Sequence, residues 1–134
     1  MPGRGTTFVR ELPGPSADAP TLLLLHGWTA TADLNWFSVY EALGRHYRIV
    51  ALDHRGHGRG IRSRKPFRLA DCADDAAALV RELGLGSVIP VGYSMGGPIA
   101  LLIDKKFLAE TLCRLDRAND GASTKEGIDM VMDS

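Results

Sequence analysis

A chain of 134 residues, 45% of them hydrophobic and 24% charged, is long enough for one domain with a single core and has the composition of an ordinary globular protein. The 16 basic and 16 acidic residues balance, so no overall charge favours nucleic acid or an anionic membrane as a partner. The first residues lack the apolar core of a signal peptide, and glycines and a proline interrupt the longest apolar stretch, at 88–103. We therefore expect a cytoplasmic protein without a membrane span.

The expected elements alternate between strands and helices, an order typical of an α/β domain with a mostly parallel sheet and helices on both faces. A weakly alternating segment at 6–12 predicts an edge strand, and the prolines and glycine that follow it predict a turn. Short apolar runs, which suit strands buried on both faces, predict three further strands at 21–25, 47–52 and 87–92.

Helices are expected between and after these strands. The first should begin near Asp33 or Asn35 and place one apolar face on the sheet, made of Trp36, Phe37, Val39, Tyr40 and Leu43. A second is expected at about 69–83, ended by Gly84 and Gly86. A third should begin just after Ser94. Both cysteines, Cys72 and Cys113, fall in helical contexts, so we interpret them as buried and reduced rather than as a disulfide or a metal pair.

The character of the sequence changes at Asp104. Lys65 is the only lysine before it, whereas a polar stretch with several lysines follows. Residues 107–115 are compatible with an amphipathic helix, Asn119-Asp120-Gly121 predicts a turn, and we expect no regular structure in roughly the last fifteen residues. We therefore divide the chain into residues 1–103 and a divergent helical or irregular tail at 104–134.

The pentapeptide Gly92-Tyr93-Ser94-Met95-Gly96 is the most specific motif in the chain. It matches G-x-S-x-G and stands between an expected strand and an expected helix, which is the context of a nucleophile elbow. In such a turn the serine backbone is strained, its hydroxyl is exposed, and side chains two residues before and after it would clash. The first N–H groups of the next helix help to stabilise an oxyanion. The alternative is a tight glycine turn with a bystander serine.

A second motif, His26-Gly27-Trp28, ends the first buried strand. Loops at the carboxyl ends of parallel strands gather at one edge of the sheet, so this loop should face Ser94. The Trp28 N–H is then a candidate second oxyanion donor beside the Met95 N–H. We interpret His26 as a structural histidine that bonds to loop backbone rather than as a catalytic base.

A third motif, Asp53-His54-Arg55-Gly56-His57-Gly58, follows the next strand. Its two histidines suggest a metal site, but no cysteine is near and the glycines favour a tight loop, so we expect neither a metal nor a cofactor. The basic residues in and after it can bind phosphate but lack the interleaved aromatic residues of a nucleic-acid surface, and we interpret this segment as a solvated loop. They are Arg55, Arg59, Arg62, Arg64, Lys65 and Arg68.

Together LLLLHGW, DHRGHG and VGYSMGG, in this order and spacing, resemble the amino-terminal half of the α/β-hydrolase superfamily, most of all its lipase, esterase and haloperoxidase-like branch. The resemblance covers about residues 6–103. It implies a partial α/β-hydrolase fold without the carboxyl-terminal strands, with Ser94 as nucleophile, Trp28 and Met95 as oxyanion-hole donors, and 53–58 as a structural loop. A serine at position 94 argues against the dehalogenase and epoxide-hydrolase branches, which use aspartate there.

The chain departs from this family after the elbow. Family members are about twice as long, and their acid and histidine follow the nucleophile. Here every histidine precedes Ser94: His26, His46, His54 and His57. The aspartates after Ser94 (Asp104, Asp116, Asp120, Asp129 and Asp133) do not complete a triad without a histidine to act as base.

These observations predict a serine ester hydrolase, truncated after the elbow, that is weak or inactive alone and whose substrate is a small-molecule or lipid-like acyl ester. The alternative is a non-catalytic fragment or a binding domain. The strand at 87–92 should lack a partner on the side where later family strands would pair. Such an edge favours self-association.

Overall fold

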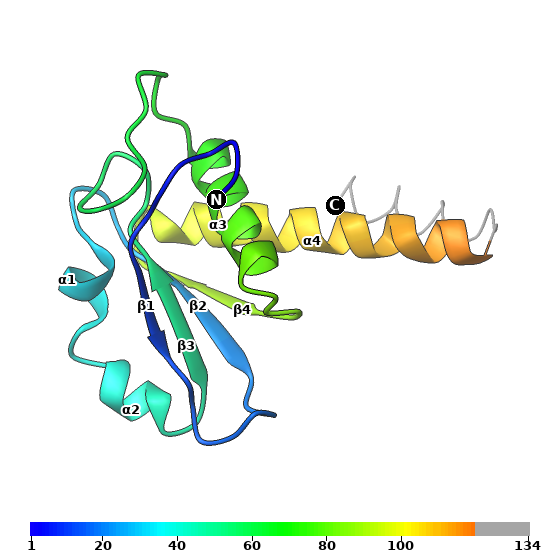
Figure 1. The fold of residues 1–134 in the computed structure, drawn as a ribbon, viewed down its shortest axis with the longest axis horizontal. Helices are drawn as coiled ribbons and strands as arrows, with labels where there is room; N and C mark the ends of the chain where they lie inside the picture. The colour runs from blue at the N-terminus through cyan, green and yellow to red at the C-terminus, as the bar shows by residue number, and fades with distance from the viewer. Residues whose placement is uncertain (120–134) are drawn as a thin grey trace.

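The computed structural model describes the backbone of residues 1–119 and the side chains of residues 1–109. Within this range, four strands form one sheet in the order β1-β3-β2-β4 (Figure 1). Strands β2, β3 and β4 are mutually parallel along the sheet, and β1 is antiparallel to β3. This is the mostly parallel α/β sheet that the sequence predicts. The strands are β1 (Val9–Leu12), β2 (Thr21–Leu25), β3 (Arg48–Leu52) and β4 (Ile89–Gly92).

Helices cover both faces of the sheet, and Figure 1 shows α1 and α2 on one side and α3 and α4 on the other. Side chains alternate along a strand, so Leu23 and Leu25 pack with α3 and α4 while Leu22 and Leu24 pack with α1 and α2. With both faces covered, every residue of β2 is buried. The helices are α1 (Ala32–Trp36), α2 (Tyr40–Gly44), α3 (Leu69–Glu82) and α4 (Gly96–Asn119).

The expectation of a single helix from Asp33 or Asn35 onward is wrong, because the structure has two short helices there. The Val39 N–H bonds to the Trp36 carbonyl at 3.0 Å, three residues back, and this tighter turn interrupts the helix. Trp36 and Tyr40 still pack on the sheet, but Phe37, which the sequence places on the same face, is 68% exposed.

Helix α3 agrees closely with the prediction. Cys72 is buried in its apolar face, and burial raises the pKa of this thiol to about 12, so the side chain behaves as a small apolar residue. Gly84 and Gly86 follow the helix with φ of 61° and 68°, backbone conformations that favour glycine. The Cys113 side chain lies outside the described residues.

Helix α4 runs without interruption across position 104 to Asn119. The turn expected at Asn119-Asp120-Gly121 and the irregular end of the chain lie outside the described residues apart from Asn119. The division at 104 therefore stays a prediction. In the part of the chain that the structure describes, no helix combines the length and the apolarity needed to cross a membrane.

Strand β4 differs from the buried strand that its apolar sequence indicates. Among the described strands it pairs with β2 alone and forms one edge of the sheet. Ile89 is consequently 49% exposed, and none of the four residues of β4 is fully buried. The expectation that this strand lies at an edge of the sheet is confirmed among the described strands. The expectation that it is buried is wrong, because no described strand covers the side of β4 away from β2.

Candidate active site

The turn between β4 and α4 holds Ser94 in a strained backbone conformation. Its φ is 53°, a left-handed value that residues other than glycine adopt rarely, and its side chain is exposed. The Gly96 N–H donates to the Tyr93 carbonyl at 2.9 Å, and the Gly97 N–H donates to the Ser94 carbonyl at 2.9 Å. These bonds close a tight strand-to-helix turn with the serine at its tip.

The two glycines of the motif stand where no side chain fits. A Cβ on Gly92 would collide with the carbonyl of Gly96, and a Cβ on Gly96 would collide with the carbonyl of Leu25 at the end of β2. The collisions involve backbone atoms, which cannot rotate away as a side chain would. The requirement for glycine expected from the motif therefore has a direct cause in this fold.

The loop after β2 lies against the elbow, as its position at the carboxyl end of a parallel strand predicts. A Cβ built on Gly27 would be 3.2 Å from the Ser94 Cβ, a tight contact that a larger residue would relieve only by shifting its neighbours, so the loop and the turn lie against each other here. The Gly27 N–H donates to the Asn35 side-chain oxygen at 2.7 Å, which fixes the loop. Trp28 is 57% exposed, and Thr29 has a φ of 57°, a second strained residue beside the elbow.

The backbone N–H groups of Trp28 and Met95 are the expected oxyanion donors. Within the described residues neither N–H donates a hydrogen bond. That they converge on one oxyanion stays a prediction.

His26 is tied to loop backbone through both ring nitrogens. Its Nδ1 lies 2.7 Å from the Gly27 carbonyl, and its Nε2 accepts the His54 N–H at 2.8 Å. These partners require the neutral ring with its proton on Nδ1. Burial is the main cause that lowers the pKa of His26. The interpretation of His26 as a structural residue is confirmed by these bonds.

The loop after β3 adds two more rings to this cluster. The His54 ring is 4.3 Å from the His26 ring between centroids, and the His57 ring is 5.3 Å from it. His54 is fully buried, and neither of its ring nitrogens has a hydrogen-bond partner among the described residues. Burial, reinforced by the neighbouring His26 and His57, lowers the pKa of His54 to about 3. His57 in turn contacts the Trp28 ring at 5.2 Å, so the two loops meet.

Asp53 joins the same loops through backbone groups. One carboxylate oxygen accepts the Ala32 N–H at 2.8 Å, and the other accepts the Arg59 N–H at 2.9 Å. Its buried charge is thus stabilised by two donors from separate segments. Sequence reasoning placed Asp53 in a structural loop without finding this role, and an aspartate directly after a buried strand was the only available signal.

The family model of the α/β-hydrolase fold matches residues 20–103, which contain β2, β3, β4 and the elbow. The chain belongs to the α/β-hydrolase family. In the terms of this family, the Ser94 turn is the structural counterpart of a nucleophile elbow.

Several α/β-hydrolase relatives are esterases or peroxidases by name. The chain is 38% identical over 81 residues to the bifunctional esterase/perhydrolase DCH of Acinetobacter calcoaceticus. The aligned region covers 60% of this chain and 29% of that protein. It is 40% identical over 77 residues to the non-heme haloperoxidase of Rhodococcus erythropolis. The aligned region covers 57% of this chain and 28% of that protein. A solved marine microorganism esterase superposes with a TM-score of 0.67 at 29% identity, over 75% of this chain and 36% of that one. The chain thus spans well under half the length of each.

No histidine of this α/β-hydrolase chain reaches Ser94 by a hydrogen bond within the described residues. His26 and His54 are buried, and His57 has its Nδ1 3.0 Å from the Arg55 carbonyl. His46 is exposed just before β3, at the opposite end of the parallel strands. The structure therefore brings the predicted nucleophile and oxyanion donors to one edge, where no histidine among the described residues hydrogen-bonds to Ser94.

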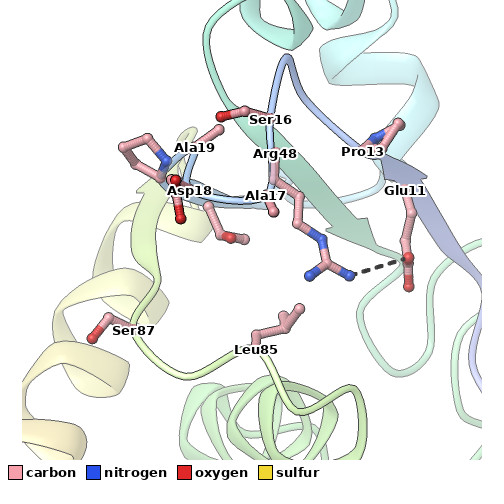
Figure 2. Close-up of a pocket in the computed structure, with 11 residues that line it drawn as sticks. Glu11, Pro13, Ser16, Ala17, Asp18, Ala19, Arg48, Leu85 and Ser87 are labelled. Atoms are coloured by element: carbon pink, nitrogen blue, oxygen red, sulfur yellow. Dashed lines mark ion pairs between the residues drawn. The ribbon is translucent and has the colours of Figure 1, made fainter.

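A cavity of about 720 Å³ lies away from this edge (Figure 2). Thr21 and Arg48, the first residues of β2 and β3, line it together with Ser87, which precedes β4. An Arg48 guanidinium nitrogen lies 3.7 Å from a Glu11 carboxylate oxygen in its wall. Because the parallel strands carry Ser94 at their carboxyl ends, this cavity at their amino ends is separate from the candidate active site.

Proposed function

We propose that this chain contains the nucleophile and the oxyanion hole of a serine ester hydrolase whose substrate is a small or lipid-like acyl ester. The observation that supports this most is the strained, exposed Ser94 between two glycines that admit no side chain. The names of the relatives, an esterase/perhydrolase among them, support the same chemistry.

In the proposed reaction, the Ser94 hydroxyl oxygen attacks the ester carbonyl carbon. The carbonyl oxygen becomes an oxyanion, which accepts hydrogen bonds from the N–H groups of Trp28 and Met95. Collapse of this intermediate expels the alcohol and leaves an acyl-serine, which water then hydrolyses to the free acid and the original serine. Both halves of the reaction need a base to accept and return a proton.

We further propose that the chain by itself is weak or inactive, because no histidine among the described residues hydrogen-bonds to Ser94. No histidine follows Ser94 in the sequence. His26 is bonded to backbone through both ring nitrogens. The same absence supports the second candidate function, a non-catalytic binding domain that keeps the elbow as a structural turn.

The first prediction separates these two functions. The purified chain is expected to hydrolyse p-nitrophenyl acetate only in traces, within the roughly 10³ to 10⁴-fold acceleration that an oxyanion hole and binding provide without a complete triad. It should react slowly with a fluorophosphonate, and peptide mass spectrometry should locate the adduct on Ser94. Ser94→Ala should abolish both signals, whereas Ser87→Ala, a change of an exposed serine at the other end of the sheet, should leave both unchanged.

Equal labelling of Ser94→Ala and the parent chain would exclude Ser94 as the nucleophile. Turnover within a few-fold of an ordinary esterase, lost in Ser94→Ala, would contradict the absence of a base. Single changes of His26, His54 and His57 would then identify the residue responsible. A folded chain with neither hydrolysis nor labelling would favour the binding domain.

The second prediction concerns self-association through β4, which we propose for its unpartnered edge. Exposed edges pair with other edges, and a charge on the edge strand opposes this. We expect light scattering to show oligomers that grow with concentration, and Ile89→Lys to shift the chain toward monomer. Leu34→Lys adds the same charge at a residue of α1 that is 62% exposed, so it serves as the control and should leave association unchanged. A monomeric parent chain at high concentration would contradict the proposal.

A further inference from the structure

A cavity of about 270 Å³ lies between the amino-terminal segment, the loop after β3 and the first turn of α3. Its charged lining residues are Arg4, Arg55, Arg62, Lys65, Arg68 and Asp71. Their positive charges are concentrated at one place on a chain with a formal net charge of zero. We propose that this cavity binds the phosphate group of a small soluble molecule, a site independent of the esterase chemistry proposed above.

The back of the cavity is built on a buried carboxylate. The Asp75 side chain is 3% exposed, and its two oxygens accept from Arg55 Nε at 2.6 Å, from Arg55 Nη2 at 2.8 Å and from Arg4 Nε at 2.7 Å. One carboxylate thus holds two guanidinium groups and neutralises only one of them. The pair is fixed before any ligand arrives, so little conformational entropy is lost on binding.

The rim supplies cations that have no carboxylate partner within the described residues. The Arg62 guanidinium bonds only to the Gly58 carbonyl. The Lys65 backbone N–H donates to the Ser63 hydroxyl. The Lys65 ammonium group forms no hydrogen bond or ion pair with the described residues. Arg68 Nη2 and Nε donate to the two Asp71 carboxylate oxygens at 2.9 Å and 3.0 Å, so Asp71 neutralises Arg68. The positive charge left over therefore lies on Arg62 and Lys65 and on the shared pair at the back.

These features favour a phosphate group. A phosphate dianion neutralises two of these three excess charges, and arginine guanidinium groups match its oxygens in geometry. No aromatic side chain lines the cavity, which distinguishes it from the base-stacking surface of a single-stranded nucleic acid. Its concave shape and small volume suit a soluble molecule rather than the flat surface of a membrane.

The test compares neighbouring basic residues. Arg62→Gln and Lys65→Gln each remove one charge from the rim, and Arg64→Gln removes the same charge from an exposed residue between Ser63 and Lys65 that does not line the cavity. None of the three changes touches the buried Asp75 network, so all variants should fold. Binding of inorganic phosphate and of glycerol phosphate is measured by calorimetry and by the rise in melting temperature, against chloride at equal ionic strength.

We expect both phosphates to bind the parent chain and Arg64→Gln alike, and to bind Arg62→Gln and Lys65→Gln about tenfold more weakly, the loss of one charge-assisted hydrogen bond. Equal weakening in Arg64→Gln would show a diffuse field and overturn the proposal, as would absence of binding to the folded parent chain. Sedimentation with phosphatidic acid vesicles distinguishes the source of the phosphate. Binding to vesicles without binding to either soluble phosphate would also overturn it.

Discussion

Replacing Gly96 with alanine is expected to lower the free energy of unfolding by about 3 kcal/mol, the upper part of the usual cost of overpacking. The added Cβ would collide with the Leu25 carbonyl oxygen and lie 2.8 Å from the Leu25 carbonyl carbon. Leu25 belongs to β2, the strand that pairs with both β3 and β4, so neither side of the collision can move without disturbing the sheet. The melting temperature should fall by about 10 °C or more.

Gly97 provides a matched control one residue away. A Cβ on Gly97 has nothing within 4 Å, and the residue lies in the first turn of the same helix. Gly97→Ala should therefore leave stability unchanged or raise it slightly, because alanine favours a helix over glycine. Thermal unfolding followed by circular dichroism checks both variants. Equal melting of Gly96→Ala and the parent chain would contradict the elbow geometry.

The strands were predictable because one physical cause determines them. A run such as 21–25 is apolar at every position, and in the structure both faces of β2 are covered, so the pattern and the environment agree. The helix expected near Asp33 was not predictable in the same way. Its apolar spacing holds at Trp36 and Tyr40, yet a local hydrogen bond from Val39 breaks it. The spacing of apolar residues indicates which side chains are buried, but it does not show where the backbone leaves the α-helical hydrogen-bonding pattern.

The elbow was predictable from a local motif, and its surroundings were only partly so. Asp75 shows what the sequence hides: three acids, Asp71, Asp74 and Asp75, stand in the early turns of α3, and the structure buries Asp75 alone among them. Its partners are Arg4 and Arg55, which lie far from it in the chain. Nothing in the local pattern distinguishes Asp75 from Asp74, which pairs with Lys106 on α4 instead. Pairing between distant residues depends on the assembled fold.

The buried histidines are another product of the assembled fold, and they link stability to pH. The folded chain holds the pKa of His54 at about 3, against 6.5 for an ordinary histidine, chiefly because burial disfavours the charged ring. The charges of His26, in the loop after β2, and of His57, in the loop after β3, lower the pKa of His54 further. Burial also lowers the pKa of His26. A histidine whose pKa falls on folding stabilises the fold while neutral. Its contribution is complete above pH 6.5 and is lost as the pH falls below 6.5 toward 3.

His54→Leu is therefore expected to reduce the loss of stability on acidification. The loss approaches about 1.4 kcal/mol per pH unit below pH 6.5 for one such group, so the parent chain should lose about 2 kcal/mol between pH 6.5 and pH 4.5 through His54 alone. The leucine variant should lose less by about that amount, with the remaining loss due partly to His26. Urea unfolding at several pH values measures the difference, and His46→Leu, which changes an exposed residue at the far end of the sheet, is the control. If His54→Leu and the parent chain lose stability in parallel as the pH falls, His54 already carries its proton in the folded chain and the burial argument fails.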